Sequence, residues 1–452
     1  MTGSWSSSDL HLDWHPGSGR RGLAEALRRA IRGGRLAPGA ALPSTRALAA
    51  DLGIARGTVT RVYSDLTAEG YLRTTQGAPT RVAADTYPPA EHREKPGPAT
   101  SAWFRDARWD LFPGRPNLAS FPRAVWASAT RRVLQSLPAG GFDYGDPAGP
   151  AVLREALARY LARSRGVLAE PDRIVLCGGY FHAITVLGHL FDEIAFENPS
   201  LPEFREAAGQ GGAKIVPVPV DERGIRVSEL DSPVAVVTPA HQYPLGVTLA
   251  PERRSALAGW AAGGGLVIED DYDGEFRFDR QPVGAMQSLS PEQVVYAGTV
   301  SKTLAPALRI GWLVLPRRLV APVRDTMASL GWRTPVVDHL ALADLLASGA
   351  YDRHVRQRRV AYRRRRDRLL AALPPDLAPE GISAGLHLVL RVPDEEAVVW
   401  ALRKRSVAVD RLSRHWMTSG PGGIVIGYGT PAEHAFGPAV EALVDGLRSV
   451  IR

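Results

Sequence analysis

One short stretch of the chain brings together a lysine, three hydroxyl groups and an arginine. It runs from Thr299 to Gly311 and contains Ser301, Lys302 and Arg309. A lysine beside hydroxyl donors and an arginine can form a Schiff base with an aldehyde whose phosphate those neighbours hold. Pyridoxal phosphate is the aldehyde that this combination suggests. Ser-Lys-Thr is also a common tripeptide, so a solvated surface lysine is the alternative interpretation of Lys302.

A second stretch, at residues 265–273, is an apolar strand that ends in carboxylates and a tyrosine. Residues 294–299 are also apolar and β-prone, so the lysine follows a buried strand. Pyridoxal phosphate becomes an electron sink only when its ring nitrogen is protonated, which a fixed carboxylate enforces. Its phenolic oxygen needs a hydrogen-bond donor. Asp270 and Tyr272 are two residues apart and would point the same way from the end of an extended strand.

Three motifs carry a resemblance to a known family. They are Glu-Asp-Asp-Tyr-Asp-Gly-Glu-Phe-Arg at 269–277, Gly-Thr-Val-Ser-Lys-Thr-Leu at 298–304 and Thr-Pro-Ala-His-Gln-Tyr-Pro-Leu-Gly at 238–246. They resemble the aminotransferase-like domain of the MocR family of bacterial transcriptional regulators. The resemblance implies that Lys302 forms an aldimine with the cofactor, Asp270 meets the ring nitrogen and Tyr272 meets the phenolic oxygen. The residues implied to hold the phosphate are Thr299, Ser301 and Arg309.

The segment around Gly179 matches the family less well. Gly179 and Tyr180 begin a helix whose backbone N–H groups can bind phosphate. The family usually has a small residue and two glutamines where Tyr180, Phe181 and His182 stand, and commonly a tyrosine where Leu201 stands. Ring stacking contributes about 0.5 to 1.5 kcal/mol, so these departures predict a more loosely held cofactor.

Two histidines and a tyrosine recur in the family pattern. The resemblance assigns His241 and Tyr243 to the cofactor site, and His387 recurs as well. For a lone histidine, a structural place in the core is the alternative. The only cysteine, Cys177, ends an apolar run and is expected to be a buried small hydrophobe. A single cysteine excludes an intramolecular disulfide and a cysteine-built metal site, and no metal is expected.

A further departure concerns the substrate. Relatives that use amino acids grip the α-carboxylate with an arginine near the C-terminus, because a planar fork suits a carboxylate. The corresponding strand here, residues 423–429, contains no arginine. Arg411 or Arg414 could substitute, and a solvated surface position is the alternative for both. Transaminase activity therefore lacks its best anchor.

The first part of the chain shows patterns in the order helix, helix, turn, helix and hairpin. Apolar residues recur at helical spacing over 22–31, and Ser44 is a good N-cap for a helix over 45–52. A third helix is expected at about 56–69, followed by two short strands around a turn at 70–83. This order predicts a winged helix-turn-helix whose third helix enters the major groove of DNA.

Four motifs here resemble the GntR type of winged helix over residues 20–84. They are Gly-Arg-Leu-Ala-Pro-Gly from 34, Leu-Pro-Ser-Thr-Arg from 42, Leu-Ala-Ala-Asp-Leu-Gly from 48 and Glu-Gly-Tyr-Leu from 69. The residues that the resemblance and the helix phase place against DNA are Arg46, Arg56, Thr58, Thr60, Arg61, Gln76 and Gly77. A solvated helix face is the alternative. The wing reads Gly77-Ala-Pro instead of the usual Gly-x-Gly.

Composition bounds the class of protein. The 452 residues, 45% hydrophobic and 23% charged, predict two or three globular domains. The chain has no apolar run that could span a bilayer and no secretory signal pattern, so we expect a cytoplasmic protein. The net charge is +8, and residues 1–84 hold eleven arginines and six acids, about +5 of it. This concentration favours an anionic partner for the N-terminal part.

Three segments follow from these patterns. A DNA-binding domain is expected at 15–84, a Pro-rich linker at 85–107 and an α/β domain at 108–452. In the last, short β-prone runs alternate with helical stretches, which predicts a mostly parallel sheet with helices on both faces and ligands at strand ends. The resemblance implies the fold type I aminotransferase architecture with a smaller α+β part at about 318–452. The arginine run 363–366 is expected to be a solvated helix face.

These observations favour a DNA-binding regulator for which pyridoxal phosphate is a signal, bound as an aldimine on Lys302. An amine or amino acid is a further possible effector. Because fold type I sites usually lie at a subunit boundary, the resemblance implies a homodimer and a paired operator. One alternative is an aminotransferase with an accessory DNA-binding domain. Another is a regulator whose cofactor site has decayed, with Phe181 and Leu201 as the symptoms.

Overall fold

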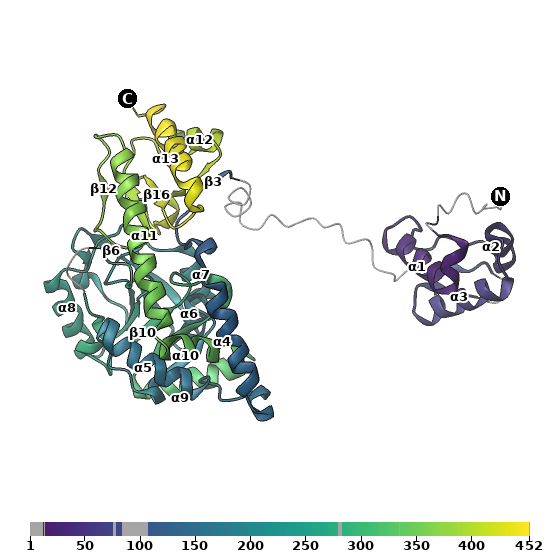
Figure 1. The fold of residues 1–452 in the computed structure, drawn as a ribbon, viewed down its shortest axis with the longest axis horizontal. Helices are drawn as coiled ribbons and strands as arrows, with labels where there is room; N and C mark the ends of the chain where they lie inside the picture. The colour runs from purple at the N-terminus through teal and green to yellow at the C-terminus, as the bar shows by residue number, and fades with distance from the viewer. Residues whose placement is uncertain are drawn as a thin grey trace. The chain divides into compact units, whose positions relative to one another are not determined.

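The chain forms two compact units, Met1–Ala102 and Trp103–Arg452, which we call the N-terminal and C-terminal units. The computed structural model describes residues 12, 14–75, 78–83, 107–278, 283–333 and 335–451. Figure 1 draws both units, and each is considered by itself. The wing residues Gln76 and Gly77, and all but residue 107 of the predicted linker, lie outside the described residues.

The N-terminal unit is a cluster of three helices followed by a short antiparallel hairpin. The elements are α1 (Gly19–Arg32), α2 (Thr45–Leu52), α3 (Arg56–Ala68), β1 (Leu72–Arg73) and β2 (Arg81–Val82). Their apolar faces share one core, which includes Leu23, Leu27, Leu48, Val59, Val62 and Leu66. The helices predicted from apolar spacing are therefore present, and the fold is the predicted winged helix-turn-helix.

Two polar contacts fix the second and third helices. Ser44 caps α2, because its hydroxyl accepts a hydrogen bond from the backbone N–H of Ala47 at 3.1 Å. The buried Tyr63 of α3 donates its hydroxyl to the Pro43 carbonyl at 3.0 Å. The first bond fixes the start of α2, and the second joins the loop before α2 to α3.

The C-terminal unit is built on an eight-stranded sheet in the order β4-β11-β10-β9-β8-β5-β6-β7. The strands are β4 (Ile174–Cys177), β5 (Glu193–Asn198), β6 (Lys214–Asp221), β7 (Gly224–Ile225), β8 (Val234–Val237), β9 (Leu266–Asp270), β10 (Val294–Thr299) and β11 (Gly311–Val314). From β10 to β6 every neighbouring pair is parallel. β11 is antiparallel to β10 and to β4. The segment 300–310 between β10 and β11 is too short for the crossover that a parallel pair needs.

Helices cover both faces of this sheet (Figure 1). One face carries α4 (Arg123–Ser136), α5 (Ala151–Arg165), α8 (Pro251–Ala262) and α10 (Val336–Ala347). The other carries α6 (Tyr180–Gly188), α7 (Pro202–Gln210) and α9 (Arg317–Ser329). Alternate strand residues supply the two cores, so Ile174 faces one layer and Val175 the other. This confirms the predicted sheet with helices on both faces.

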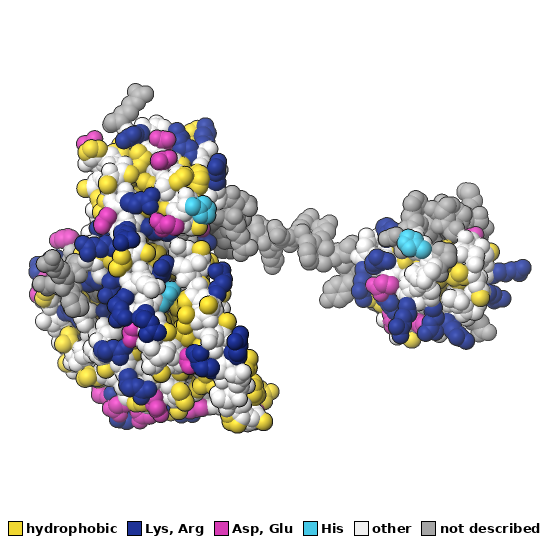
Figure 2. All heavy atoms as spheres, viewed as in Figure 1, with side chains coloured by type: hydrophobic (Ala, Val, Ile, Leu, Met, Phe, Trp, Pro, Cys, Tyr) yellow, Lys and Arg dark blue, Asp and Glu magenta, His cyan; other side chains and the backbone are white. Residues whose placement is uncertain are grey.

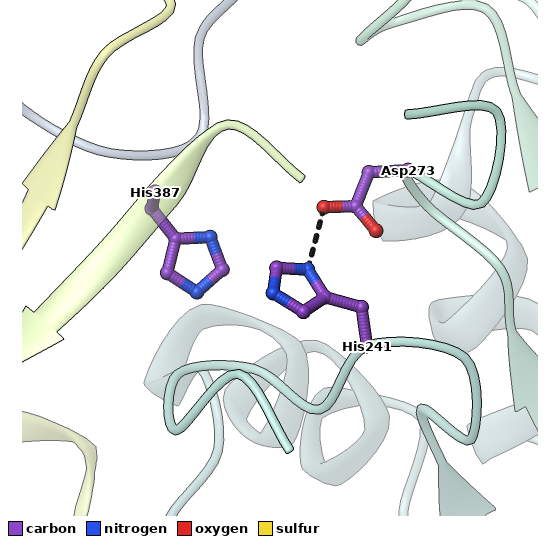
Figure 3. Close-up of side chains that lie close together, drawn as sticks. All are labelled: His241, Asp273 and His387. Atoms are coloured by element: carbon purple, nitrogen blue, oxygen red, sulfur yellow. Dashed lines mark hydrogen bonds and ion pairs between the residues drawn. The ribbon is translucent and has the colours of Figure 1, made fainter. Parts of the chain in front are cut away.

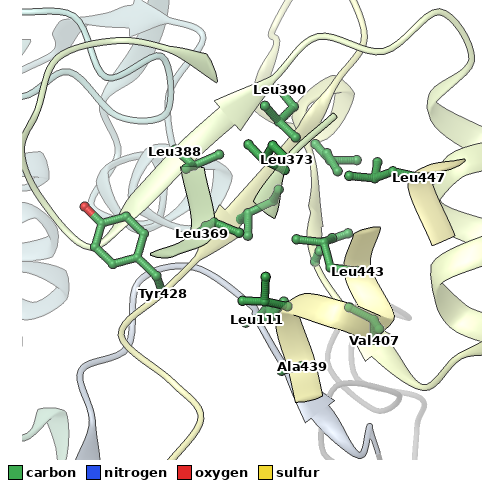
Figure 4. Close-up of a cluster of buried hydrophobic side chains, with 14 of the residues drawn as sticks. Leu111, Leu369, Leu373, Leu388, Leu390, Val407, Tyr428, Ala439, Leu443 and Leu447 are labelled. Carbon is green, nitrogen blue, oxygen red and sulfur yellow. The ribbon is translucent and has the colours of Figure 1, made fainter. Parts of the chain in front are cut away.

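A smaller lobe completes the unit. It contains the sheet β12-β13-β16-β15 and the pair β14-β3. The strands are β3 (Trp109–Asp110), β12 (Pro379–Glu380), β13 (His387–Leu390), β14 (Val407–Ala408), β15 (Asp410–Arg411) and β16 (Ile424–Gly427), and the helices are α11 (Ala350–Ala372), α12 (Glu395–Lys404) and α13 (Glu433–Arg448). Figure 4 shows its core, in which Leu111 meets Leu388 and Leu443. The lobe thus includes the start of the unit.

Two details of this region differ from the sequence expectation. We placed the start of the smaller part at about 318, but Val323 of α9 and Leu342 of α10 pack on the large sheet. Within the arginine run 363–366, Arg365 is 1% exposed. It faces the core on the same side as Leu369, and it pairs with Glu433 at 2.8 Å. Helix phase, which the run of identical residues hides, decides this burial.

No helix among the described residues has the length and apolar character that crossing a bilayer requires.

Candidate functional site

The ends of neighbouring parallel strands open into a cavity of about 340 Å³ in the C-terminal unit. β9 ends at Asp270 and β10 ends at Thr299, and their carboxyl ends share one edge of the sheet. Nine predicted cofactor residues line this cavity. They are Gly179, Tyr180, Tyr243, Asp270, Tyr272, Thr299, Ser301, Lys302 and Arg309. His241 is the tenth predicted residue, and it lies behind Tyr272 instead of on the cavity wall.

Lys302 follows β10, and its side chain lines the cavity. Its Nζ donates a hydrogen bond to the Gly114 carbonyl at 2.6 Å. Burial lowers the pKa of the Lys302 amine, while Asp270 and Asp273 act in the opposite direction. A lowered pKa increases the share of unprotonated amine, which is the form that attacks an aldehyde.

The acidic motif after β9 divides between the cavity and the protein interior. Asp270 is 5% exposed, and its Oδ1 has no hydrogen-bond partner among the described residues. Burial raises the pKa of Asp270 well above its usual value, and the charge of Lys302 opposes that rise. Asp271 points away and receives two hydrogen bonds from Arg165, at 2.6 and 3.0 Å. Within this motif, Asp270 therefore offers the cavity a carboxylate oxygen without a partner. Elsewhere on the lining, Oε2 of Glu203 is a second such oxygen.

Hydroxyl, guanidinium and backbone groups converge at the end of the cavity near α6. A Cβ added to Gly179 would lie 3.8 Å from Thr299 Oγ1 and 3.9 Å from Ser301 Oγ. Arg309 Nη1 would be 4.0 Å away. Gly179 has φ +88°, and the N-terminus of α6 begins at the next residue. Side-chain donors and a helix N-terminus together form a cradle for an anion such as phosphate.

Arg309 reaches this cradle from an unusual backbone conformation. Its φ is 54°, in the left-handed region. Such a conformation costs a non-glycine residue on the order of 1 to 3 kcal/mol and persists only where the surrounding structure holds it. The turn between β10 and β11 supplies that support, because Val300 donates its backbone N–H to the Ile310 carbonyl at 3.2 Å.

A hydrogen-bonded network supports Tyr272 from behind. Its hydroxyl lies 3.1 Å from His241 Nδ1, and the same nitrogen lies 2.9 Å from Asp273 Oδ2. Figure 3 shows the imidazole of His387 beside that of His241, with the contact to Asp273 drawn. His241, Asp273 and His387 each have a ligand atom within 4.8 Å of those of the other two, close enough for the three to hold a metal ion. His387 Nε2, however, is 3.1 Å from the Pro244 carbonyl, so protein hydrogen bonds engage both rings.

The positions that depart from the family take up distinct places. Phe181 is 42% exposed and Leu201 is partly buried, and both line the cavity. His182 Nδ1 accepts the Gly178 N–H at 3.1 Å, and its ring lies 3.9 Å from that of Trp332. Burial lowers the pKa of His182 to about 4, which keeps the ring neutral. The imidazole of His182 is therefore engaged by a backbone hydrogen bond just before α6.

The two arginines considered as carboxylate anchors differ. Arg411 points toward Glu396, away from the cavity. Arg414 lines the cavity, but it donates to Asp410 Oδ2 at 3.0 Å and also pairs with Glu203. Because two carboxylates offset its charge, Arg414 is a weaker anchor for a substrate carboxylate than an unpaired arginine would be.

Several residues of the cavity were missed by sequence reasoning, among them Gly114, Glu197 and Phe204. Glu197 lies one residue before the end of β5, so the rule that ligands collect at strand ends could have found it. Burial raises its pKa to about 7. Gly114 and Phe204 reach the cavity from segments outside the parallel strands, and no sequence signal indicated this.

The N-terminal unit presents its candidate DNA-binding residues to solvent. Arg46 on α2, and Arg56, Thr60 and Arg61 on α3, are exposed, whereas Thr58 is half-buried. The Thr60 hydroxyl donates to the Arg56 carbonyl at 3.0 Å, so at rest it bonds its own helix. Arginine side chains are visible on the face of this unit in Figure 2. Gln76 and Gly77 lie outside the described residues.

Comparison with known families assigns a description to each unit. Residues 20–82 match the gntR family of bacterial regulatory proteins, and residues 117–422 match aminotransferase class I and II.

Among individual relatives, the chain is 33% identical to the HTH-type pyridoxine biosynthesis transcriptional regulator PdxR of Corynebacterium glutamicum, covering 91% of this chain and 92% of that one. It is also 33% identical to the probable rhizopine catabolism regulatory protein MocR of Rhizobium meliloti, covering 90% and 89%. An HTH-type regulator thus matches over nearly the whole length in both cases.

Solved structures resemble the C-terminal unit. An archaeal alanine:glyoxylate aminotransferase has a TM-score of 0.69 at 26% identity, covering 75% of this chain and 90% of that one. The α-aminoadipate aminotransferase LysN of Thermus thermophilus, solved with N-(5'-phosphopyridoxyl)-L-leucine, has a TM-score of 0.68 at 21% identity, covering 75% and 92%. At this identity the second likeness shows the fold alone.

Proposed function

This chain belongs to the MocR-type transcriptional regulators, in which a gntR DNA-binding domain is joined to an aminotransferase-like domain, and we propose that it senses pyridoxal phosphate and adjusts its binding to DNA accordingly. The domain is of the class that binds pyridoxal phosphate. The relative named for pyridoxine biosynthesis supports the cofactor itself as the signal.

One observation carries the proposal. The cavity places a lysine, a buried carboxylate oxygen without a partner and an anion cradle along one wall. These are the three groups that an aldehyde, a pyridine nitrogen and a phosphate require. The free Oδ1 of Asp270 and the convergence of Thr299, Ser301 and Arg309 on Gly179 support the fit of these residues to the cofactor.

Each residue then has a defined task. Pyridoxal phosphate, when bound, supplies an aldehyde and a ring that withdraws electrons. Lys302 provides the amine for the covalent link, Asp270 holds a proton on the ring nitrogen and Tyr272 donates to the phenolic oxygen. Thr299, Ser301, Arg309 and the N–H groups at Gly179 and Tyr180 bind the phosphate. Tyr243 lines the cavity beside them, and His241 acts on the site through Tyr272.

Cofactor binding is coupled to DNA binding by a difference in affinity. A ligand shifts an equilibrium between two arrangements only as far as its affinity differs between them. DNA binding through Arg46, Arg56, Thr58, Thr60 and Arg61 would then change between the cofactor-free and the loaded protein. By reciprocity, operator DNA changes the affinity for the cofactor by the same factor.

A homodimer is part of the proposal. Exposed apolar side chains concentrate between residues 118 and 152 of the C-terminal unit, where Tyr144 is 84% exposed. The others are Leu118, Val125, Leu134, Phe142 and Val152. In Figure 2 hydrophobic side chains are visible on the lower part of this unit, near α4. Apolar surface of this kind favours a second copy of the chain as its partner. A dimer would present two DNA-binding units to a paired operator.

The main alternative is an aminotransferase. Lys302, Asp270 and Tyr272 would serve either function. The state of Arg414, paired with Asp410 and Glu203, favours the sensor, because an amino-acid substrate needs a cation for its carboxylate.

The test is a visible absorption spectrum of the full chain with pyridoxal phosphate, for the wild type and for Lys302→Ala and Lys302→Arg. We expect a band that borohydride removes in the wild type and that both variants lack. DNA affinity is then measured with and without cofactor, on a duplex selected in vitro by the full chain, and we expect it to change for the wild type only.

Each other outcome is informative. A wild type without the band contradicts cofactor sensing and the aminotransferase reading together. A band in Lys302→Ala contradicts the assignment of the lysine. A band with unchanged DNA affinity contradicts sensing, and turnover of the bound cofactor by an added amino donor then favours the enzyme.

A further inference from the structure

The proposed binding of phosphate by the backbone N–H of Tyr180 does not explain where its side chain lies. Tyr180 is the first residue of α6, directly after Gly179 at the anion cradle. Its side chain is 6% exposed and lines the cavity. Its hydroxyl is fully buried and has no hydrogen-bond partner among the described residues. A buried hydroxyl without a partner is destabilising, so its position calls for a ligand or a partner that forms on binding.

The surroundings of the ring define its direction. The ring of Phe204 packs edge-on against that of Tyr180, with centroids 4.7 Å apart at 71°. Burial raises the pKa of the Tyr180 phenol well above its usual value, and the nearby carboxylates of Asp270 and Glu197 raise it further. The side chains of Tyr180, Asp270 and Glu197 all line the same cavity, into which the carboxylate proposed for the ring nitrogen also opens.

We propose that Tyr180 supplies the aromatic face on which the pyridoxal ring packs, and that its hydroxyl donates a hydrogen bond to Asp270. The inference rests on the proposed cofactor site. A bound cofactor would place its phosphate at the cradle and its ring nitrogen at Asp270, and Tyr180 lines the same cavity directly after Gly179 of the cradle. Leu201 on the same wall offers only an aliphatic side chain. Tyr180 Oη and Asp270 Oδ1 both lack a partner among the described residues, and they are chemically matched as donor and acceptor.

The hydrogen bond gives Tyr180 a task besides packing. Donation to a carboxylate favours its charged form. Asp270 must be charged to keep a proton on the ring nitrogen, while its burial acts against that charge. Phe204 holds the phenol in place from the side. Tyr180 thus offsets part of the burial at Asp270 while it supports the ring.

The experiment uses the full chain in three variants that separate ring from hydroxyl. Tyr180→Phe keeps the ring and removes the hydroxyl. Tyr180→Leu removes both. Phe181→Leu removes a neighbouring ring on the same helix and cavity wall, and serves as the matched control. Three quantities are measured: the Kd for pyridoxal phosphate, the pH midpoint of the visible band and the melting temperature with and without cofactor.

We expect Tyr180→Leu to raise the Kd by about 3- to 10-fold, the range of an aromatic stacking contact. Tyr180→Phe should change the Kd by less than about 2-fold and move the pH midpoint of the band by roughly half a unit or more, because Asp270 loses its donor. Without cofactor, Tyr180→Phe should melt no lower than the wild type, because the hydroxyl it lacks had no partner. Phe181→Leu should raise the Kd less than Tyr180→Leu does, because Phe181 is 42% exposed, and it should leave the pH midpoint where it is in the wild type.

Other results overturn the inference and leave the cofactor site itself intact. If Tyr180→Leu binds as the wild type does, or if Phe181→Leu weakens binding equally, the ring of Tyr180 is not the supporting face. If Tyr180→Phe leaves the pH midpoint unchanged, its hydroxyl does not serve Asp270. A wild type without any visible band would instead remove the proposed function on which the inference rests.

Discussion

The two units of the chain use charged residues in opposite ways. In the N-terminal unit the arginines proposed to contact DNA lie on exposed helix faces, above a core built from apolar side chains. In the C-terminal unit the carboxylates in and around the site are buried, although Arg309 of the cradle is exposed. Asp270, Asp273, Glu197 and Glu269 are each less than 6% exposed.

The difference follows from the partners. A DNA backbone is a large anion approached from solvent, so exposed arginines suffice and their effect depends on salt. A small cofactor is enclosed, and its ring nitrogen needs a carboxylate shielded from water, where electrostatic effects are stronger. The C-terminal unit therefore carries the cost of burying charge, and its stability should depend on ion pairs and pH far more than that of the N-terminal unit.

The largest expected effect comes from one buried ion pair. In the C-terminal unit Arg165 and Asp271, 6% and 2% exposed at their side chains, form two hydrogen bonds, and Tyr296 also donates to Asp271 at 2.7 Å. Arg165→Met should lower the free energy of unfolding by about 3 to 5 kcal/mol, because it leaves a carboxylate buried without its partner. Urea unfolding of the full chain measures this.

A control in the other unit sharpens the result. Arg28 pairs with Glu69 at the surface of the N-terminal unit. Arg28→Met should leave the unfolding curve almost unchanged, because solvent screens exposed pairs. Adding Asp271→Asn to Arg165→Met should recover part of the loss. Equal losses from Arg165→Met and Arg28→Met would contradict the comparison.

The next effect concerns pH. Burial raises the pKa of Glu197 from its usual value of 4.5 to about 7. Between these values the folded protein binds more protons than the unfolded chain, so the stability from this group is present below pH 4.5 and is lost as the pH rises through 7. Glu197→Gln should remove up to about 3 kcal/mol of that loss. Unfolding of wild type and variant at several pH values from 5 to 8 tests it, and parallel curves would refute it.

A third effect belongs to the exposed arginines. Arg46→Gln and Arg56→Gln should each weaken DNA binding by about 1 to 3 kcal/mol if they reach bases. If they reach phosphates, each should reduce the slope of log Kd against log salt by about 0.9. Fluorescence anisotropy over a salt series separates the two cases. The visible band with pyridoxal phosphate should not change, and an altered band would show that these residues do more than bind DNA.

The smallest effect compares two helix caps. Ser44→Ala removes the cap of α2, and Asp394→Ala removes that of α12, whose carboxylate accepts the Ala397 N–H at 2.9 Å. Each should cost about 1 kcal/mol. We expect only the first to weaken DNA binding, since α2 supports α3. An equal loss of DNA affinity from both variants would argue against local control of the recognition helix.

Much of the fold was predictable because it depends on local pattern. Apolar spacing over 22–31 and the N-cap at Ser44 predicted two helices of the N-terminal unit, and the structure has both. Alternating β-prone and helical runs predicted the parallel sheet. Since ligands collect at strand ends, Asp270 and Lys302 were predicted to meet, and both line the cavity.

The parts that were missed depend on packing between distant segments. Arg365 looked like its neighbours in an arginine run, but it is buried where α11 meets Glu433 of α13 and the carbonyls of Gly429 and Pro431. His241 was placed with the cofactor residues, but tertiary structure sets it behind Tyr272. Gly114 lies far from Lys302 in the sequence, and its carbonyl still accepts a hydrogen bond from the lysine amine.

The sequence by itself determined the two-part organisation and the identity of the reactive groups, because helix caps, strand periodicity and motif spacing are properties of neighbouring residues. Only the tertiary structure decided which groups are buried and which lack a partner. It turned Asp271 toward Arg165 and left Asp270 open to the cavity. It also placed Tyr180 on the same cavity as that carboxylate, with its hydroxyl buried and without a partner among the described residues. Burial and hydrogen bonding depend on contacts between segments that are far apart in the chain, so the local sequence pattern does not predict them.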